Sequence, residues 1–329
     1  MLKDDVLSML KRSQESYLSG QRLSERLGVS RAAVWKAVDA LRKDGFEIDS
    51  RPNCGYRLTR MPDVLSPEAL SRAGTRQMGR RVLLFDTLDS TNNEIKRQSI
   101  HQVENGLTVI ADCQTGGRGR RGRSFVSPAG KGLYLSLLMQ PRCSLEEVSM
   151  LTAWSAAALC GAVERVCGVR PGIKWPNDLV LQGKKLCGVL TELEVEAESG
   201  LPRYVIIGIG VNVFQTEADF GPEVAPIAIS LEQALGRAPG RAELACEILR
   251  AMDALYQDFP GERARYLEAD RRDCLTQNKP VSVVRPNGTR QGFASGIDEN
   301  FALLVRWEDG TEEAVSAGEV SVRGLYGYV

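Results

Sequence analysis

The sequence lacks any apolar run that could cross a bilayer: its longest, Val205–Phe214, has about half of the ~20 residues that a transmembrane helix needs. The first residues, Met1–Asp5, include a lysine and two acids where a signal peptide would carry an apolar core. The chain of 329 residues also has no excess charge, with 42 Lys and Arg against 42 Asp and Glu. No overall field therefore draws it to nucleic acid or to a membrane. These absences predict a cytoplasmic protein with no membrane partner, in which any DNA contact comes from a local basic face.

Histidine is nearly absent as well. The single one, His101, lies in a polar stretch, and the sequence has no G-x-S-x-G turn to accompany it. A Ser-His-Asp hydrolase and a His-ligated metalloenzyme are therefore excluded. The eight cysteines form no C-x-x-C pair, so zinc-site spacing is missing and a disulfide framework is not expected. We expect reduced thiols, and no metal site built from protein ligands alone.

A basic segment stands at the N-terminus. Residues 1–60 carry twelve Lys and Arg against eight Asp and Glu, an excess of four positive charges. Ser19 and Ser30 are predicted to cap two short helices joined by the turn Gly28-Val29. Two short helices around a glycine-containing turn, the second of them basic, are typical of a helix-turn-helix. The second helix has its apolar stripe at Val34, Val38 and Leu41, with Arg31, Lys36, Arg42 and Lys43 largely off that stripe.

Two alternating segments after these helices predict the strands of a wing. They are Gly45–Asp49 and Tyr56–Leu58, on either side of the turn Pro52–Gly55. The wing and the local charge favour DNA binding over the alternative, a small helical docking module that never touches DNA. The residues expected to face DNA are Arg31, Trp35 and Lys36, with Arg42 and Lys43 nearer the DNA backbone.

The rest of the chain divides into two patterns. After a linker with two prolines, strand-like runs alternate with helical ones, of which Ser144–Val166 and Arg241–Phe259 are the longest. From Lys279 onward the pattern changes to short strands separated by turn residues, as in Pro286–Gly288 and Glu308–Gly310. The first pattern predicts a mixed α/β domain, and the second predicts an all-β module of ~50 residues, a small barrel.

The segment Gly116–Arg123 is dense in glycine and arginine and follows a predicted strand. Its glycines let backbone N–H groups approach a ligand closely, and its arginines place positive charge among them. Phosphate or carboxylate is the natural partner. The segment is neither a Walker A loop nor a G-x-G-x-x-G turn opening a helix. An RNA-binding Arg-Gly segment is the alternative, although such segments usually lie in long disordered tracts.

Four further polar segments are candidates for chemistry. Lys174–Asp178 presents a cation, an amide and a carboxylate within five residues, and Pro176 restricts the residue before it to an extended conformation. Lys185 stands at the mouth of a strand, and Gly208–Asn212 is a glycine-thinned strand that ends in an amide. Asp89–Asn92 offers several hydrogen-bonding groups, although by itself it could be a helix N-cap.

Together these segments resemble one family, the biotin–protein ligases, over essentially the whole chain and in the right order. The N-terminal segments Ser30–Lys36 and Cys54–Leu58 resemble the winged domain of the bifunctional biotin operon repressor/ligases. The catalytic motifs that carry the resemblance are Asp89–Asn92, Gln114 with Gly117–Arg123, Lys174–Asp178, Lys185–Gly188 and Gly208–Asn212.

The resemblance implies an α+β multidomain fold. A winged helix-turn-helix DNA-binding domain is expected over residues 1–61. A biotin- and ATP-binding catalytic domain similar in fold to class II aminoacyl-tRNA synthetases follows over residues 68–274. A C-terminal SH3-like β-barrel is expected over residues 275–329.

The resemblance also implies the reaction. Biotin and ATP form biotinyl-5′-AMP and pyrophosphate, with Mg²⁺ on the phosphates, and biotin then passes to a lysine of the biotin carboxyl carrier protein of acetyl-CoA carboxylase. The bound intermediate promotes a homodimer that represses biotin genes at operator DNA. Two alternatives stay open: a ligase whose winged domain is only a scaffold, and a ligase for lipoate or octanoate.

Site residues follow from the matching motifs. Arg118, Arg120, Lys174 and Lys185 are expected to balance the charge of the reacting groups. Asp178 is expected to orient either a lysine amine or the metal. The residues expected to bind biotin and the adenylate are Ser90, Thr91, Asn92, Gln114, Gly117, Arg118, Gly119, Arg120, Arg121, Phe125, Lys185, Gly188 and Asn212.

Phe125 marks a departure from the family pattern. Related ligases commonly place a tryptophan two residues beyond the arginine-rich loop, where adenine packs, and this chain has Ser124-Phe125 there. Phenylalanine keeps an apolar face but loses area and the indole N–H. We expect this change to affect the affinity for the nucleotide rather than the type of reaction.

Overall fold

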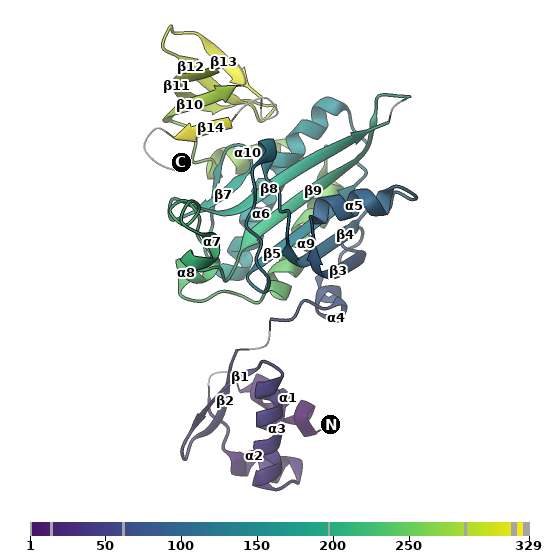
Figure 1. Ribbon diagram of the computed structural model, residues 1–329, viewed down its shortest axis with the longest axis vertical. Coiled ribbons are helices and arrows are strands. Elements are labelled where there is room, and N and C mark those ends of the chain that lie inside the picture. The colour runs from purple at the N-terminus through teal and green to yellow at the C-terminus, as the bar shows by residue number, and fades with distance from the viewer. Residues whose placement is uncertain are drawn as a thin grey trace. The chain divides into compact units, whose positions relative to one another are not determined.

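The computed structural model describes residues 2–13, 16–60, 63–196, 198–285, 288–316 and 321–324. The chain forms two compact units, Met1–Val64 and Leu65–Val329 (Figure 1). Each is described by itself below. In the part of the chain that the structure describes, no helix is both long and apolar enough to span a membrane. All eight cysteines are free.

The N-terminal unit is a winged helix-turn-helix. Ser19 accepts a hydrogen bond from the Arg22 N–H at 3.1 Å and Ser30 accepts one from the Ala33 N–H at 3.1 Å, so both predicted caps are confirmed. The stripe of the last helix is buried, as its spacing predicts. The first helix has no counterpart in the sequence-based prediction, yet it contributes Val6 to the core. The elements are α1 (Leu2–Arg12), α2 (Gly20–Leu27), α3 (Arg31–Lys43), β1 (Glu47–Arg51) and β2 (Gly55–Arg60).

A seven-stranded sheet forms the centre of the second unit, in the order β3-β4-β5-β9-β8-β7-β6. The pair β3 and β4 is parallel and every other neighbouring pair is antiparallel. Each of the six strand-like runs that the sequence predicts in this region corresponds to a strand: Val82–Phe85, Leu107–Asp112, Leu133–Met139, Leu179–Leu181, Leu186–Leu193 and Tyr204–Val213. The strands are β3 (Arg81–Leu88), β4 (Leu107–Gln114), β5 (Gly132–Met139), β6 (Gly172–Lys174), β7 (Asp178–Leu181), β8 (Lys184–Val195) and β9 (Pro202–Asn212).

Helices cover both faces of this sheet (Figure 1). The two long predicted helices, α6 (Leu145–Cys167) and α9 (Arg241–Asp258), pack together on one face over the main core. On the other face α5 (Thr91–Ser99) buries Ile95 against a smaller apolar cluster. Part of that second face is therefore left for a site. The shorter elements are α4 (Pro67–Leu70), η1 (Ser71–Ala73), η2 (Arg120–Gly122), α7 (Glu217–Phe220), α8 (Leu231–Leu235) and α10 (Arg263–Asp273).

The C-terminal module is an antiparallel sheet of five strands in the order β13-β12-β11-β10-β14, as the all-β pattern predicts. It shares the core of the larger unit. The indole N–H of Trp175 donates to the Phe301 carbonyl at 3.0 Å, which joins the Lys174–Asp178 segment directly to this module. The strands are β10 (Lys279–Arg285), β11 (Gly288–Ile297), β12 (Leu303–Trp307), β13 (Glu312–Val315) and β14 (Ser321–Gly324).

Candidate active site

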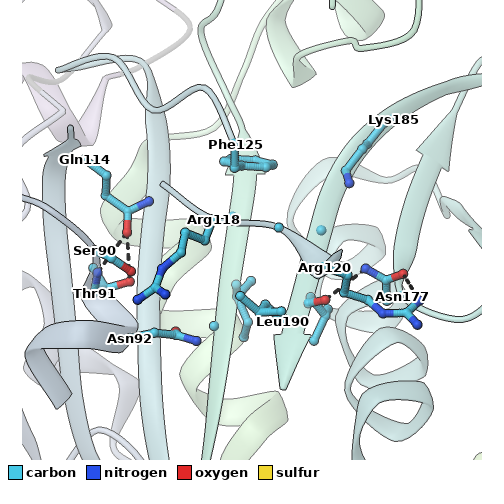
Figure 2. A pocket seen from close by; sticks show the side chains of 16 residues that line it. Ser90, Thr91, Asn92, Gln114, Arg118, Arg120, Phe125, Asn177, Lys185 and Leu190 are labelled. Atoms are coloured by element: carbon cyan, nitrogen blue, oxygen red, sulfur yellow. Dashed lines mark hydrogen bonds between the residues drawn. The ribbon is translucent and has the colours of Figure 1, made fainter. Parts of the chain in front are cut away.

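A narrow pocket of about 50 Å³ lies on the open face of β8 and β9, beside the start of α5 (Figure 2). Segments far apart in the sequence meet here: the start of α5, the end of β4, the arginine-rich loop and the strand after Lys184. Of the residues expected to bind biotin and the adenylate, the pocket brings together Ser90, Thr91, Asn92, Gln114, Arg118, Gly119, Arg120, Phe125, Lys185 and Gly188.

The floor of the narrow pocket is made of glycine. Gly188 of β8 pairs with Gly210 of β9, and Gly208 lies two residues along the same strand and therefore on the same face. A Cβ atom on Gly210 would lie 2.6 Å from the ring of Phe125, and one on Gly188 would lie 3.1 Å from the Lys185 Nζ atom. The missing side chains therefore let Phe125 and Lys185 lie close to the sheet.

Side-chain hydrogen bonds fix one wall of this pocket. The Gln114 Oε1 atom accepts from the backbone N–H of Thr91 at 2.9 Å and from its hydroxyl at 3.1 Å. The Gln114 amide donates to Ser127 at 3.0 Å, and Ser136 donates to the Thr91 hydroxyl at 2.6 Å. Thr91 and Ser136 are buried, so the wall is held in place before any ligand binds.

A second chain of contacts starts at Asn92, which is also buried. Its amide donates to Glu192 at 2.6 Å, and the Lys96 ammonium donates to the same carboxylate at 2.8 Å. Burial acts to raise the pKa of Glu192, but these two bonds outweigh it and hold that pKa below its ordinary value. Glu192 therefore stays ionised and orients the Asn92 amide toward the sheet.

The arginine-rich loop borders the narrow pocket and a wider one. Arg120 lines both and donates to the Asn177 Oδ1 atom at 3.1 Å. Burial lowers the pKa of its guanidinium, despite the opposing effect of Asp178, and the nearby charges of Arg121 and Arg123 add to the lowering. A partly desolvated cation among like charges is stabilised when an anion arrives. Arg118 donates to Asn93 on α5.

The wider cavity has a volume of about 390 Å³ and adjoins the narrow one at Gly119, Arg120, Phe125, Asn177 and Lys185. It brings together the other expected residues Arg121, Lys174, Asp178 and Asn212. Another wall consists of ordinary apolar residues, of which the sequence pointed only to the segment near Asn212–Gly221. These are Phe220, Val224, Ile227 and Ala228 from the segment after β9, with Val322 of β14.

Asp178 and Lys185 form an ion pair at the junction of the cavities. The lysine Nζ atom donates to the Asp178 Oδ1 atom at 2.6 Å, and the Asn177 amide donates to the same oxygen at 3.1 Å. Among the described residues that line the wider cavity, Asp178 is the one that carries a carboxylate. Within the described ranges no group of three or more His, Cys, Asp or Glu side chains stands together as a metal cage. A cation here would therefore take most of its ligands from a bound phosphate and from water.

Gly117 lies beneath the site and is not among the residues that line either cavity. Its carbonyl accepts a hydrogen bond from the Phe125 N–H at 2.9 Å, and a Cβ atom there would overlap the Phe125 carbonyl and the Ser127 hydroxyl. A glycine is required at this position because the two chain segments approach each other so closely.

The residues expected to face DNA stand on α3 in the N-terminal unit. Arg31, Trp35 and Lys36 are exposed, and Trp35, at 53%, is a large apolar side chain left open to solvent. Arg42 instead reaches the wing, where its guanidinium donates to the Ile48 carbonyl at 2.6 and 3.1 Å. The Lys43 ammonium pairs with Asp39 at 2.9 Å in the same helix.

Family models match three parts of the chain in order. They are the HTH domain over residues 3–57, the biotin/lipoate A/B protein ligase family over residues 84–212, and the biotin protein ligase C terminal domain over residues 276–323. The biotin protein ligase from Aquifex aeolicus, solved in complex with biotin and ATP, matches with a TM-score of 0.64 and 28% identity. That match covers 74% of this chain and 99% of the other.

Two curated relatives match almost from end to end. The bifunctional ligase/repressor BirA of Bacillus subtilis is 36% identical over 319 residues, which cover 96% of this chain and 97% of the relative. The bifunctional ligase/repressor BirA of Escherichia coli is 31% identical over 311 residues, which cover 93% and 92%. Since these relatives match more than nine-tenths of the chain at over 30% identity, and family models match its three parts in order, the chain belongs to the biotin–protein ligase family, in its group of bifunctional ligase/repressors.

Proposed function

We propose that this protein joins biotin to ATP and transfers the biotinyl group to a lysine of the biotin carboxyl carrier protein of acetyl-CoA carboxylase. The observation that carries the proposal is the shared edge of the two cavities, where Arg120 and Lys185 stand together. Joining a carboxylate to a triphosphate brings like charges together, so cations must stand where the two substrates meet. The site has that arrangement.

The narrow pocket is assigned to biotin. The hydrogen-bonded Thr91 and Gln114 on one side suit a compact polar ring, and the glycine floor suits a slim apolar chain. The carboxylate at the end of that chain would then point toward Lys185 and Arg120. Ser90, Asn92 and Arg118 complete the lining.

The wider cavity is assigned to ATP. Phe125 offers an apolar aromatic face for adenine, and the loop arginines with Lys174 offer charge for the phosphates. Mg²⁺ would bind the phosphates and neutralise part of their charge when the nucleotide is present. Because Asp178 already accepts from Lys185 at 2.6 Å, we assign it the orientation of that lysine rather than the ligation of the metal.

The chemistry then runs in two displacements. A biotin carboxylate oxygen attacks the α-phosphorus of ATP, the bond to the β-phosphate oxygen breaks, and pyrophosphate leaves with that electron pair. The neutral amine of the carrier lysine next attacks the acyl carbon of biotinyl-5′-AMP, AMP leaves, and the amine releases its extra proton. Arg120 and Lys185 stabilise the negative charge that develops in the first step.

The direct test is to incubate the purified protein with biotin, ATP, Mg²⁺ and the carrier domain and to weigh the carrier. One biotinyl group per carrier is expected. The same assay with lipoate or octanoate tests the related specificity, and modification by those acids alone would overturn the assignment to biotin.

We also propose that the N-terminal unit binds operator DNA of biotin genes as part of a ligand-promoted dimer, in the cytoplasm where its substrates are found. One winged unit with a local excess of four charges neutralises few phosphates, so a monomer should bind weakly. Two units held by a two-fold axis would grip both halves of a palindrome. When carrier is scarce, biotinyl-5′-AMP would remain bound and promote that pairing.

The test is a gel shift on the promoter of the chain's own biotin genes, with and without biotin and ATP. Binding should require both ligands, and Lys36→Ala should weaken it while Lys11→Ala, an exposed lysine on α1, should not. Sedimentation of the same samples reports the dimer. Normal ligation without any DNA binding would leave the winged domain as a scaffold.

A further inference from the structure

Gln215 is a fully buried amide just beyond the end of β9, and neither cavity contains it. Every polar atom of its side chain has a partner. The Oε1 atom accepts from the Val213 N–H at 2.7 Å, and the Nε2 atom donates to the Tyr134 hydroxyl at 3.1 Å and to the Asn212 Oδ1 atom at 3.3 Å. Its backbone carbonyl accepts from the Ser230 hydroxyl at 2.7 Å.

These partners are the fixed ends of a segment that walls the wider cavity. The chain leaves the sheet at Asn212, runs through α7, and returns at Ser230, the N-cap of α8. Between those points it supplies four of the residues that line the wider cavity. At the return, the Asn212 amide donates to the Ile229 carbonyl at 3.2 Å and to the Lys185 carbonyl at 3.3 Å. The Gln215 amide is therefore bonded to the start of this wall, and it reaches the return at Ile229 and the backbone of Lys185 through Asn212.

Tyr134 carries the contact to the opposite side of the same cavity. Its ring stands edge-on to the ring of Phe125, with centroids 6.3 Å apart at 75°. Burial raises the pKa of Tyr134 well above its ordinary value, so the hydroxyl stays protonated and donates to the Pro128 carbonyl at 3.2 Å while it accepts from Gln215. One amide thus lies between the wall segment and the aromatic residue assigned to adenine.

We propose that Gln215 and Tyr134 are a pair of positioning residues for the nucleotide, which hold the wall after β9 and the ring of Phe125 in register with each other. The inference rests on the proposed function, because it takes the wider cavity as the ATP site. Burying an amide is costly unless all its bonds are made, and packing alone would be served as well by leucine. We therefore attribute the fully bonded amide at this position to the alignment of the wall after β9 with the ring of Phe125.

The test compares Gln215→Leu, Gln215→Glu and Tyr134→Phe with the parent enzyme. Tyr204→Phe serves as the matched control, because it removes a hydroxyl from a buried tyrosine on the same sheet but outside both cavities. Three quantities are measured: the Kd of biotin alone, the KM of ATP in pyrophosphate release, and the dissociation rate of biotinyl-5′-AMP.

We expect Gln215→Leu to raise the KM of ATP and the dissociation rate of the intermediate by about tenfold or more, since three side-chain hydrogen bonds are lost, two to the wall and one to Tyr134. Gln215→Glu keeps the oxygen that accepts from Val213 but loses the N–H donor. It should therefore also raise the KM of ATP and leave the Kd of biotin unchanged. Tyr134→Phe should raise the KM of ATP by a smaller factor, because Gln215 keeps its hydrogen bond to Asn212. The Kd of biotin should change by less than about twofold, since no bond to Thr91 or Gln114 is touched.

A purely structural role would lower the melting temperature and weaken biotin and ATP to the same extent, and that result would overturn the proposal. An unchanged KM of ATP in Tyr134→Phe and Gln215→Glu would also overturn it. If Gln215→Leu does not fold, the two milder variants still decide the matter. Failure of the parent enzyme to form biotinyl-5′-AMP would instead refute the proposed function, so the two failures are distinguishable.

Discussion

The two adjoining cavities are built in different ways. The narrow pocket is closed by side chains that bond to one another, as Thr91 does to Gln114, above a floor of paired glycines. The wider cavity is enclosed by an arginine-rich loop on one side and by the segment after β9 on the other. One wall and the floor of the narrow pocket are therefore shaped before its ligand binds, whereas the wider cavity depends on two loop segments being held in position.

This difference teaches how one site can bind two substrates of unlike chemistry. A small acid is recognised by a rigid set of hydrogen bonds, because each misplaced donor or acceptor costs binding free energy. A triphosphate is recognised mainly by charge, which tolerates movement of long arginine side chains. Variants should therefore separate into those that affect biotin, those that affect ATP, and those at the junction that affect both.

The largest effect is expected at the junction. Lys185→Ala removes a cation that balances the developing charge. We expect the activation free energy of adenylate formation to rise by about 3–4 kcal/mol, which lowers the rate roughly a hundredfold to a thousandfold. The matched control is Lys184→Ala, which removes the neighbouring lysine from outside both cavities. Equal rates for Lys185→Ala and the parent in a pyrophosphate release assay would show that this lysine has no part in the chemistry.

Asp178→Asn tests how that lysine is held. The variant keeps the shape of the side chain but loses the charged partner at 2.6 Å, so kcat should fall by about tenfold to a hundredfold. Biotin binding measured by calorimetry should weaken by less than kcat falls, because Lys185 keeps its charge beside the biotin carboxylate. If Asp178 ligated the metal instead, raising the Mg²⁺ concentration would restore the rate, and that rescue would contradict the assigned role.

Gln114→Leu should break the narrow pocket alone. It removes the acceptor of two hydrogen bonds from Thr91, each contributing about 1 kcal/mol, so the Kd of biotin should rise by about tenfold or somewhat more. The KM of ATP should change by less than about twofold. A parallel loss of ATP affinity would mean that the two cavities are not independent.

The smallest effect on ligation is expected at Asp270, which lines neither cavity. Burial, with Asp273 nearby, raises the pKa of this carboxyl to about 7, although Arg271 opposes the shift. It is 1% exposed, and among the described residues neither of its oxygens has a hydrogen-bond partner. Because the folded protein holds this proton more tightly than the unfolded chain, the free energy of unfolding should fall as pH rises from about 4 to about 7.

Asp270→Asn should remove that pH dependence. Above pH 7 the variant should be more stable than the parent, on the order of 4 kcal/mol at most, and the difference should vanish near pH 4. Urea unfolding across this range measures it. Ligation rates and the ratio of biotin to ATP affinity should be unchanged at temperatures where both proteins are folded. If the variant and the parent had the same free energy of unfolding at pH 8, the parent would not pay a cost for burying an ionised Asp270.

The sequence predicted local features best. Ser19 and Ser30 cap their helices because a hydroxyl beside a free N–H group needs no distant partner, and the stripe of α3 follows from helical spacing alone. The motif Lys174–Asp178 was singled out for the same reason, since its groups lie within five residues.

Features that depend on strand pairing could not be predicted. The pairing of Gly188 with Gly210 follows from the order β5-β9-β8, which no local pattern determines. Phe220 and Ile227 look like ordinary core residues in the sequence, and only the return of the chain to Lys185 makes them a cavity wall. The helix α10 was missed because its face is largely charged, and its anchor is the stacking of Tyr266 on Trp154, with centroids 4.0 Å apart.

The glycine floor also has a genetic consequence. Every missense mutation in a glycine codon adds atoms. At Gly208 and Gly210 those atoms enter space already taken by Asn92 and Phe125, and at Gly188 they crowd the end of Lys185. No single nucleotide change at these codons can enlarge the pocket. Drift or laboratory selection toward a bulkier acid must therefore begin at other residues of the lining, such as Leu190, whose side chain can be shortened. At these three glycines, a mutation can only make the pocket smaller.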